Sequence, residues 1–248
     1  MLSKFNRPFI VVILAAFIFS GVLIYTHHDR YVDLIVTVFG TFVAAWAGGW
    51  AAFSAERKTR DEAERNIRIS SANKALFTIA TMFNVFDNLR QFFIDHEDIR
   101  QSEDRAFLMD SPQPGMMQSL HFDFDSLNYF LDQDGELCSM ALVELRVLDW
   151  HHQALLNTVE LRAVAHDDLR KAVLSKNIPN LTHESLQTIF RAEYAKLAAL
   201  TDQFIRQVDE GIATTKKMDN QMQIALQSIF PGQSFVQIRF AQKTLQSE

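Results

Sequence analysis

Few residues of this chain combine a type and a spacing that could support chemistry. Asp149 and His152 are three positions apart, a spacing that places two metal ligands on one face of a helix. A di-metal site in a helical protein needs a second such pair and further carboxylates, and the sequence contains no second pair. We therefore interpret His151, His152 and His166 as residues of a helix surface or interface rather than as metal ligands.

The motifs of nucleotide-binding, hydrolytic and thiol enzymes are missing from the sequence. It contains no glycine-rich phosphate loop, no H-E-x-x-H, no C-x-x-C and no G-x-S-x-G. The single cysteine, Cys138, cannot form an intramolecular disulfide, and its neighbours Leu137 and Met140 are typical of a buried thiol. We therefore predict that the chain is not an enzyme and that it binds no cofactor or metal ion.

The charge balance argues against direct binding of nucleic acid. The chain has 24 Lys and Arg residues against 30 Asp and Glu residues, a net charge of −6 at neutral pH. Affinity for DNA and RNA rests largely on Lys and Arg contacts to phosphates. We therefore expect no direct nucleic-acid binding.

Two apolar runs dominate the first 54 residues. The first, residues 8–25, spans about 27 Å as a helix, close to the hydrocarbon thickness of a bilayer. A cleaved signal peptide is the alternative, but the run is long for one, and it lacks a clear A-x-A cleavage site. The second run, residues 34–53, contains no ionisable group. Only eight residues separate the runs, so we expect a transmembrane hairpin.

The second apolar run carries a stripe of small residues. Gly40, Ala44, Gly48 and Ala52 recur every four positions, and such stripes allow helix backbones to approach closely in lipid. The stripe is predicted to pack against residues 8–25 of the same chain, or also between subunits of a homo-oligomer. If several hairpins assemble around a pore, its lining would include the hydroxyl-bearing residues of this run, which are Thr37 and Thr41.

The positions of basic residues predict the orientation in the membrane. Basic residues concentrate on the cytoplasmic side of membrane segments. They precede the first run and follow the second, whereas Arg30 alone lies in the connecting loop. These flanking residues are Lys4, Arg7, Arg57, Lys58 and Arg60. We therefore expect both termini in the cytoplasm and the loop on the opposite side of the membrane.

Residues 55–248 are typical of a water-soluble helical domain. Acidic residues precede basic ones by four positions after residue 55, as in Glu56 and Arg60, which favours a solvated helical stalk. Apolar residues then recur every three or four positions up to Phe93. Further helices are predicted over 136–175 and 182–229, the latter capped by Thr182.

The intervening segments are predicted to be short. Residues 95–115 form a loop, a short helix begins near Asp125, and the tail from Phe235 to Phe240 alternates as a short strand would. The fold class is therefore an all-α membrane protein. We divide it into a transmembrane hairpin at 1–54 and a cytoplasmic antiparallel helical bundle at 55–248.

The series GTFVAAWAGGWAAFSAERKTRDEAE, followed by SANKALFTIATMFNVFDNLRQ, resembles bacterial two-transmembrane-helix effectors of the retron-associated anti-phage type. The resemblance covers residues 31–91, and it rests on the small residues, the charged stalk and the helix that follows. The residues that carry it are Gly40, Thr41, Phe42, Ala44, Ala52, Phe53, Glu56, Asn73, Lys74, Ala75, Leu76, Phe77 and Asn88.

This resemblance implies a function in anti-phage defence. Such a toxin is held silent by a reverse transcriptase with its DNA–RNA product, and on release it damages the inner membrane. The alternative expectation is a passive membrane anchor or scaffold that holds a soluble partner at the bilayer. No residue motif of the chain distinguishes the two.

Overall fold

The computed structural model describes residues 21, 30–95, 102, 104–112, 117–132, 136–176 and 182–238. Of residues 30–36 it describes only the backbone. The expected first membrane helix at 8–25, the connecting loop, Lys4 and Arg7 therefore lie outside the description, apart from the backbone of Gly21 and the loop's last residues. The chain divides into two compact units, Met1–Arg65 and Asn66–Glu248.

The described residues are helical and contain no strand. The first element, α2 (Arg30–Leu89), is a single helix of 60 residues that begins in the first unit and ends in the second. A π-helical turn, η1 (Arg90–Ile94), follows it directly. No Gly or Pro interrupts the helix after Trp50, and the earlier glycines, Gly40, Gly48 and Gly49, lie within it as helical residues.

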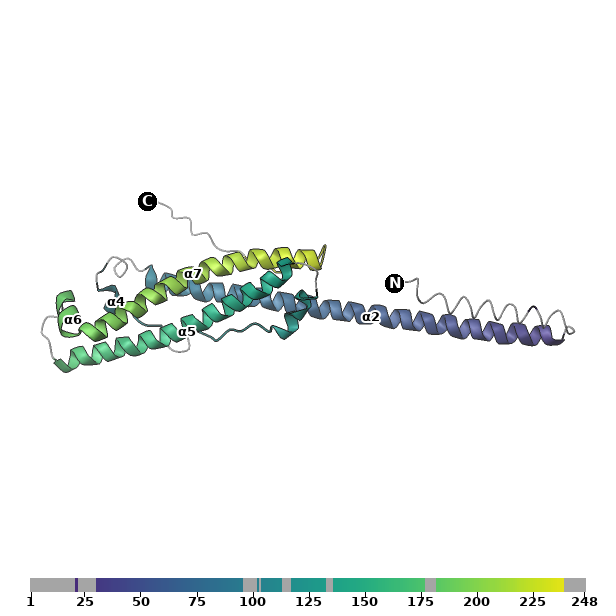
Figure 1. Ribbon diagram of the computed structural model, residues 1–248, viewed down its shortest axis with the longest axis horizontal. Coiled ribbons are helices and arrows are strands. Elements are labelled where there is room, and N and C mark those ends of the chain that lie inside the picture. Colours follow the sequence, from purple (N-terminus) through teal and green to yellow (C-terminus); the bar gives the residue numbers. More distant parts are fainter. Residues whose placement is uncertain are drawn as a thin grey trace. The chain divides into compact units, whose positions relative to one another are not determined.

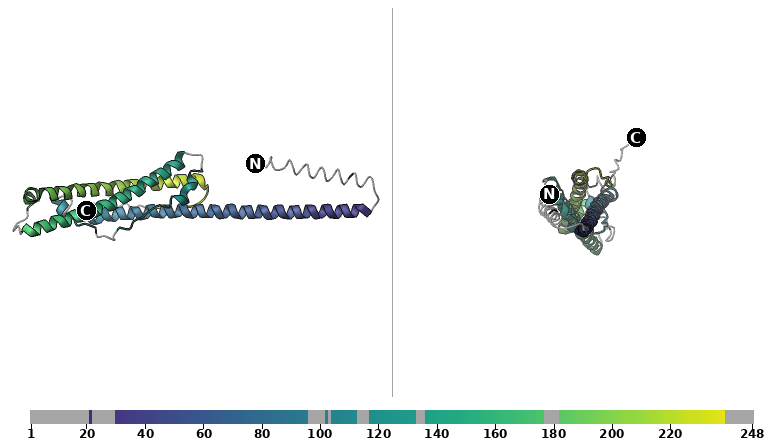
Figure 2. Two further views of the ribbon diagram at one scale, coloured as in Figure 1. Left: turned by 60° about the horizontal axis from the view of Figure 1, so that its bottom comes forward. Right: turned by 90° about the vertical axis from the view of Figure 1, so that its right-hand side faces the viewer.

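The second unit, Asn66–Glu248, contains two further long helices and several short elements. The long ones are α5 (Glu136–Lys176) and α7 (Arg191–Ile229), which lie side by side and run in opposite directions (Figures 1 and 2). The short ones are α4 (Arg105–Leu108), the 3-10 helix η2 (Asp125–Phe130) and α6 (His183–Ile189).

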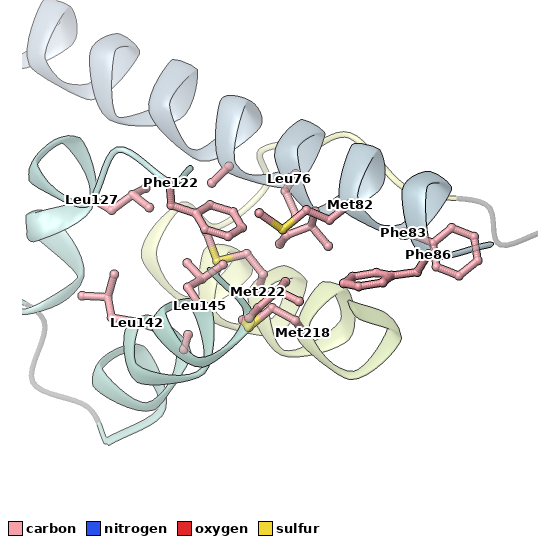
Figure 3. Packing of buried hydrophobic residues seen from close by; sticks show 14 of the residues in the cluster. Leu76, Met82, Phe83, Phe86, Phe122, Leu127, Leu142, Leu145, Met218 and Met222 are labelled. Carbon is pink, nitrogen blue, oxygen red and sulfur yellow. The ribbon is translucent and has the colours of Figure 1, made fainter. Parts of the chain in front are cut away.

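A main hydrophobic core forms where α2, α5 and α7 meet in this second unit. Its side chains come from the end of α2, from α5 up to Val159 and from α7 from Phe204 onward, together with residues of η2 and the segments beside it (Figure 3). The buried residues that Figure 3 labels are Leu76, Met82, Phe83, Phe86, Phe122, Leu127, Leu142, Leu145, Met218 and Met222. A three- to four-residue spacing on each long helix places these side chains on one face.

A smaller core lies where the last part of α5 meets α6 and the start of α7. It contains Leu169 of α5, Leu186 of α6 and Leu197 of α7, with Phe190 between the last two helices. Phe190 is 2% exposed and has a non-helical backbone, with φ −118° and ψ 35°. The predicted single helix from Thr182 to Ile229 was therefore wrong, because the chain bends at Phe190 to bury its ring.

Other local predictions had mixed outcomes. The Thr182 cap is confirmed, since Thr182 Oγ1 accepts a bond from Ser185 N at 3.2 Å. The predicted loop at 95–115 contains the short helix α4. Residues 235–238 form no strand; instead Val236 N donates to Asn73 Oδ1 at 3.3 Å, and Val236 O accepts from Gln223 Nε2 at 2.6 Å.

Candidate functional site

The apolar part of α2 is the first candidate site. Within the described residues, one helical stretch, Thr37–Ile94, is long and apolar enough to cross a membrane. None of its apolar window is buried against other parts of the protein. The side chains of this window therefore meet either lipid or partner helices when the helix is in a bilayer.

Small residues occupy one face of this window and large aromatic residues the opposite face. Gly40, Ala44, Gly48 and Ala52 follow one line along the helix, and all four are exposed. No described atom outside the local helix backbone lies within 4 Å of a Cβ placed on Gly40 or Gly48. Among the described residues, therefore, no partner contacts these two glycines.

The aromatic face consists of Phe42, Trp46, Trp50 and Phe53, each between 42% and 62% exposed. The rings of Trp46 and Trp50 stack with centroids 5.9 Å apart. Tryptophan is enriched at the boundary between lipid and water. The charged part of α2 begins only three residues after Phe53, which is consistent with a boundary at this level.

The hydroxyl of Thr41, one of the two predicted pore-lining residues, has a hydrogen-bond acceptor on its own helix. Thr41 Oγ1 donates a hydrogen bond to the carbonyl oxygen of Thr37, one helical turn earlier. A hydroxyl that bonds its own helix backbone is satisfied in lipid. Thr41 therefore does not need a water-filled path, although it shares the face of the small residues.

The basic residues after the apolar window are exposed on α2. Arg60 and Glu56 lie 3.5 Å apart, and Lys58 and Glu62 lie 3.9 Å apart, both as pairs one turn apart. Arg57 lies between them and is also exposed. Exposed pairs of this kind contribute little to stability, so their main physical effect is on solvation of the helix and on its orientation at a membrane surface.

A buried arginine separates the two hydrophobic cores of the second unit. Arg162 of α5 is fully buried, at 0% exposure, between residues of the main core and residues of the smaller one. All five of its N–H groups donate. Nε bonds Thr201 Oγ1 at 3.0 Å, Nη1 bonds Asp110 O at 3.1 Å and Ser111 Oγ at 2.7 Å, and Nη2 bonds the carbonyl oxygens of Ala106 and Met109.

The acceptors of Arg162 are neutral oxygens. Burial disfavours the charged guanidinium and lowers its pKa to about 10, and the nearby negative charge of Asp110 partly offsets this lowering. The group still carries its charge at neutral pH. Because every donor is already used, this arginine has none left for a ligand, and its role is to hold residues 106–111 against α5 and α7.

Further contacts attach the segment around α4 to three helices. His166 Nε2 bonds Phe107 O at 2.9 Å, Asp104 contacts His183 of α6, and Arg105 forms an ion pair with Asp202 of α7. A cleft of about 140 Å³ lies beside α4, and its charged lining residues are Arg90, Asp95, Arg105 and Asp209. Arg90 lies within 3.6 Å of both Asp95 and Asp209. The charges in this cleft are thus largely compensated.

The three histidines singled out in the sequence each contact a backbone carbonyl. His151 Nε2 lies 2.9 Å from Gln207 O, and His152 Nε2 lies 3.1 Å from Gln118 O. His152 is fully buried, and burial lowers its pKa, so the ring is neutral at pH 7. With His166 described above, these histidines join α5 to α7 and to the connecting segments.

Ser119, His121 and Asp149 form a polar chain that sequence reasoning missed. Ser119 Oγ lies 2.9 Å from His121 Nε2, and His121 Nδ1 lies 3.5 Å from Asp149 Oδ1. The order matches a nucleophile, a base and an orienting acid. Ser119 and His121 are both exposed, and Gln153 Nε2 of α5 donates to Ser119 Oγ at 3.5 Å and to Leu120 O at 3.3 Å. We interpret the chain as a tie between residues 117–124 and α5.

No group of three or more His, Cys, Asp and Glu side chains among the described residues is arranged to hold a metal ion. Asp149 and His152 are thus not part of a cluster of three or more possible metal ligands among these residues. The burial of Arg162 was not predicted from the sequence. Its position on the same helical face as Leu155 and Leu169 could have indicated it.

Comparison of the chain with protein-family models, with characterised proteins and with solved structures finds no match to any of them. The resemblance carried by residues 31–91 accordingly stays an expectation.

Proposed function

We propose that the chain is a membrane-anchored effector of bacterial anti-phage defence that perturbs the inner membrane when a partner complex releases it. In this proposal, residues 8–25 and 34–53 form a transmembrane hairpin. Both termini are cytoplasmic, and residues 55–248 form an antiparallel helical bundle that receives the signal.

The observation that carries the proposal is the continuity of α2. The same unbroken helix contains the apolar window, with its stripe of small residues, and the core residues Leu76 to Phe86. In this proposal, a displacement of the helical bundle passes along the shared helix to its membrane part. A passive anchor needs only an apolar segment, and a flexible linker would suffice to attach it.

The proposed action on the membrane requires several copies. One hairpin is too small to enclose a pore, so copies must associate through their membrane helices. The residues Gly40, Ala44, Gly48 and Ala52 are exposed among the residues that the structure describes, and their small side chains allow another helix to approach closely. By resemblance, the silencing partner is a reverse transcriptase with its DNA–RNA product.

The test places a leucine on the small-residue face. Gly48→Leu should block close helix packing, at a cost of about 1–3 kcal/mol for overpacking a tight contact. The matched control is Val43→Leu, which adds one methylene on another face of the same helix. Each chain is expressed without the silencing partner, and a membrane-potential dye is followed.

We expect the parent and Val43→Leu to depolarise the membrane and Gly48→Leu to lose this activity at equal membrane levels. Equal depolarisation by all three chains would support the effector proposal but reject the small-residue stripe as the contact between copies. No depolarisation by the parent, with or without an infecting phage, would reject the effector and favour the passive anchor.

A further inference from the structure

Helix α5 exposes a second apolar face to solvent. Six large apolar side chains along one line of this helix are between 46% and 69% exposed, a level that would be unusual for one packed face of a soluble domain. These residues are Met140, Val143, Val147, Trp150, Leu161 and Val164. We call them, with the half-buried Ala154 and the exposed Asn157 between them, the outer seam.

The outer seam follows a heptad pattern. Its eight positions alternate steps of three and four residues from Met140 to Val164 without interruption. This is the a/d pattern of a coiled coil, sustained over more than three heptads. Each position of the outer seam has a buried residue two positions before it; for example, Leu145 precedes Val147 and Leu148 precedes Trp150. Two positions correspond to about half a turn, so the buried face and the outer seam are on opposite sides of the helix.

The exposed area is large enough for a stable contact. With ordinary side-chain areas, the outer seam exposes on the order of 600 Å² of apolar surface, at the upper end of the largest patch on a typical monomer. A standard protein interface buries about 800 Å² on each partner. The flanking polar atoms of the helix would supply the remainder. Glu136 and Asp168 place charges one step beyond each end of the seam and so limit its length.

We propose that the outer seam is the interface between two copies of this chain, paired in parallel through α5. This inference rests on the proposed membrane anchoring, because anchoring sets the direction of pairing. The pair is a two-stranded coiled coil formed by α5 helices of neighbouring copies, on the side of α5 that faces away from α2 and α7.

Self-pairing explains the one polar residue inside the seam. In a parallel pair each seam position faces the same position of the other copy. Asn157 then faces Asn157, and each amide supplies both the donor and the acceptor that the other needs. A single asparagine in an apolar seam sets the register and the number of strands. An unrelated partner would need a matching polar residue at this one layer.

The attachment to the membrane distinguishes parallel from antiparallel pairing. In the second unit, the Asn66 end of α2 lies beside the start of α5, since Tyr129 OH near that start donates to Arg68 O at 3.2 Å. A parallel pair brings both Asn66 ends to the same side, where both chains can enter one membrane. An antiparallel pair sets Arg146 beside Glu160 of the other copy, which is favourable, but it sends the two Asn66 ends in opposite directions.

Anchoring also strengthens the contact. Two copies held in one membrane meet at a far higher effective concentration than free domains do. A seam of moderate affinity is therefore sufficient. The pairing would also bring the membrane parts of two copies into the same region of the bilayer, which the effector proposal requires.

The test is disulfide cross-linking of the full chain in bacterial membranes. Val143→Cys places a thiol in the seam, and in a parallel pair the two thiols face each other. Arg170→Cys is the control, an exposed residue of the same helix away from the seam. The native Cys138 is buried, and the parent chain controls for it. Mild oxidation should shift most of Val143→Cys to twice the monomer mass and leave Arg170→Cys and the parent as monomers.

Two results would overturn the proposal. Cross-linking only when Val143→Cys is combined with Leu161→Cys in one chain indicates antiparallel pairing. No cross-link at Val143 under any condition, at normal protein levels, indicates that lipid or another protein covers the seam. A second variant, Trp150→Glu combined with Val143→Cys, should abolish the cross-link if the seam is the contact.

The cross-linking experiment tests the dimer proposal, and the membrane-potential dye tests the effector proposal, so the two can fail independently. If Val143→Cys cross-links but the parent chain never depolarises the membrane, the dimer proposal is supported and the effector proposal is rejected. If the parent chain depolarises the membrane but Val143→Cys stays monomeric, the effector proposal is supported and pairing through the outer seam is rejected.

Discussion

At the scale of single residues, Arg162 shows how a buried charge can be held without a carboxylate. Three backbone carbonyls and two hydroxyls accept all five of its N–H groups. Burial of a charge is costly, and it is tolerated when every donor is satisfied. Because Ala106 belongs to α4 and Met109 and Asp110 follow it directly, the arginine holds α4 and the residues after it in place.

The substitution Arg162→Ala should therefore destabilise the protein strongly. It leaves buried carbonyls without donors and opens a cavity between the two cores, so we expect a loss of about 3–5 kcal/mol. Thermal unfolding of the purified chain in detergent, followed by near-ultraviolet circular dichroism, would measure it. Arg170→Ala, an exposed arginine on the same helix, is the control and should change little. Similar melting of both variants would contradict this account of Arg162.

At the scale of elements, periodicity predicted the long helices well. The expected helix at 136–175 corresponds to α5, and the Thr182 cap was correct, because both depend on local spacing and capping chemistry. The bend at Phe190 could not be predicted, because it depends on a ring that enters a core built from α4, α5 and α7. The strand predicted from Phe235 had no partner strand to pair with among the described residues.

Sequence reasoning found part of the candidate site. The stripe from Gly40 to Ala52 is visible as a spacing, and in the structure it lies on one exposed face of α2. The buried contacts of Arg162 and the outer seam of α5 were not found. Both faces of α5 repeat with the same steps of three and four, and only burial distinguishes the inner from the outer.

The crossing of α2 and α7 supports a prediction about packing. A Cβ on Gly211 of α7 would lie 2.5 Å from the ring of Phe86, which is fully buried against His151 and His152. The ring has no room to move, so Gly211→Ala should cost about 1–3 kcal/mol, against a gain of about 1 kcal/mol in helix propensity.

The same thermal measurement would show a lower midpoint for Gly211→Ala. Adding Phe86→Leu should recover part of the loss caused by the clash, because the smaller side chain leaves space for the new methyl group. A midpoint equal to or above that of the parent in the single variant would show that the helices do not approach this closely at Gly211.

At the scale of the whole molecule, the predicted topology is open to a direct test. Reporter fusions at residues 29 and 248 should respond in opposite ways, because basic residues flank the hairpin on the side of the termini. Alkaline phosphatase, active only outside the inner membrane, should be active at residue 29 and inactive at residue 248. Green fluorescent protein at residue 248 should fluoresce. Phosphatase activity at residue 248 would refute cytoplasmic termini.

The continuity of α2 also has a consequence for biosynthesis. The apolar face of residues 72–89 is made early, yet its partners on α7 extend to Leu226. Roughly 140 residues separate them, which at 5–20 residues per second corresponds to about 7–28 s of translation. During this time the face has no α7 to cover it, while the preceding apolar segment is already available to the insertion machinery. The ribosome-bound chain is therefore a strong candidate client for chaperones that shield apolar helices at the membrane.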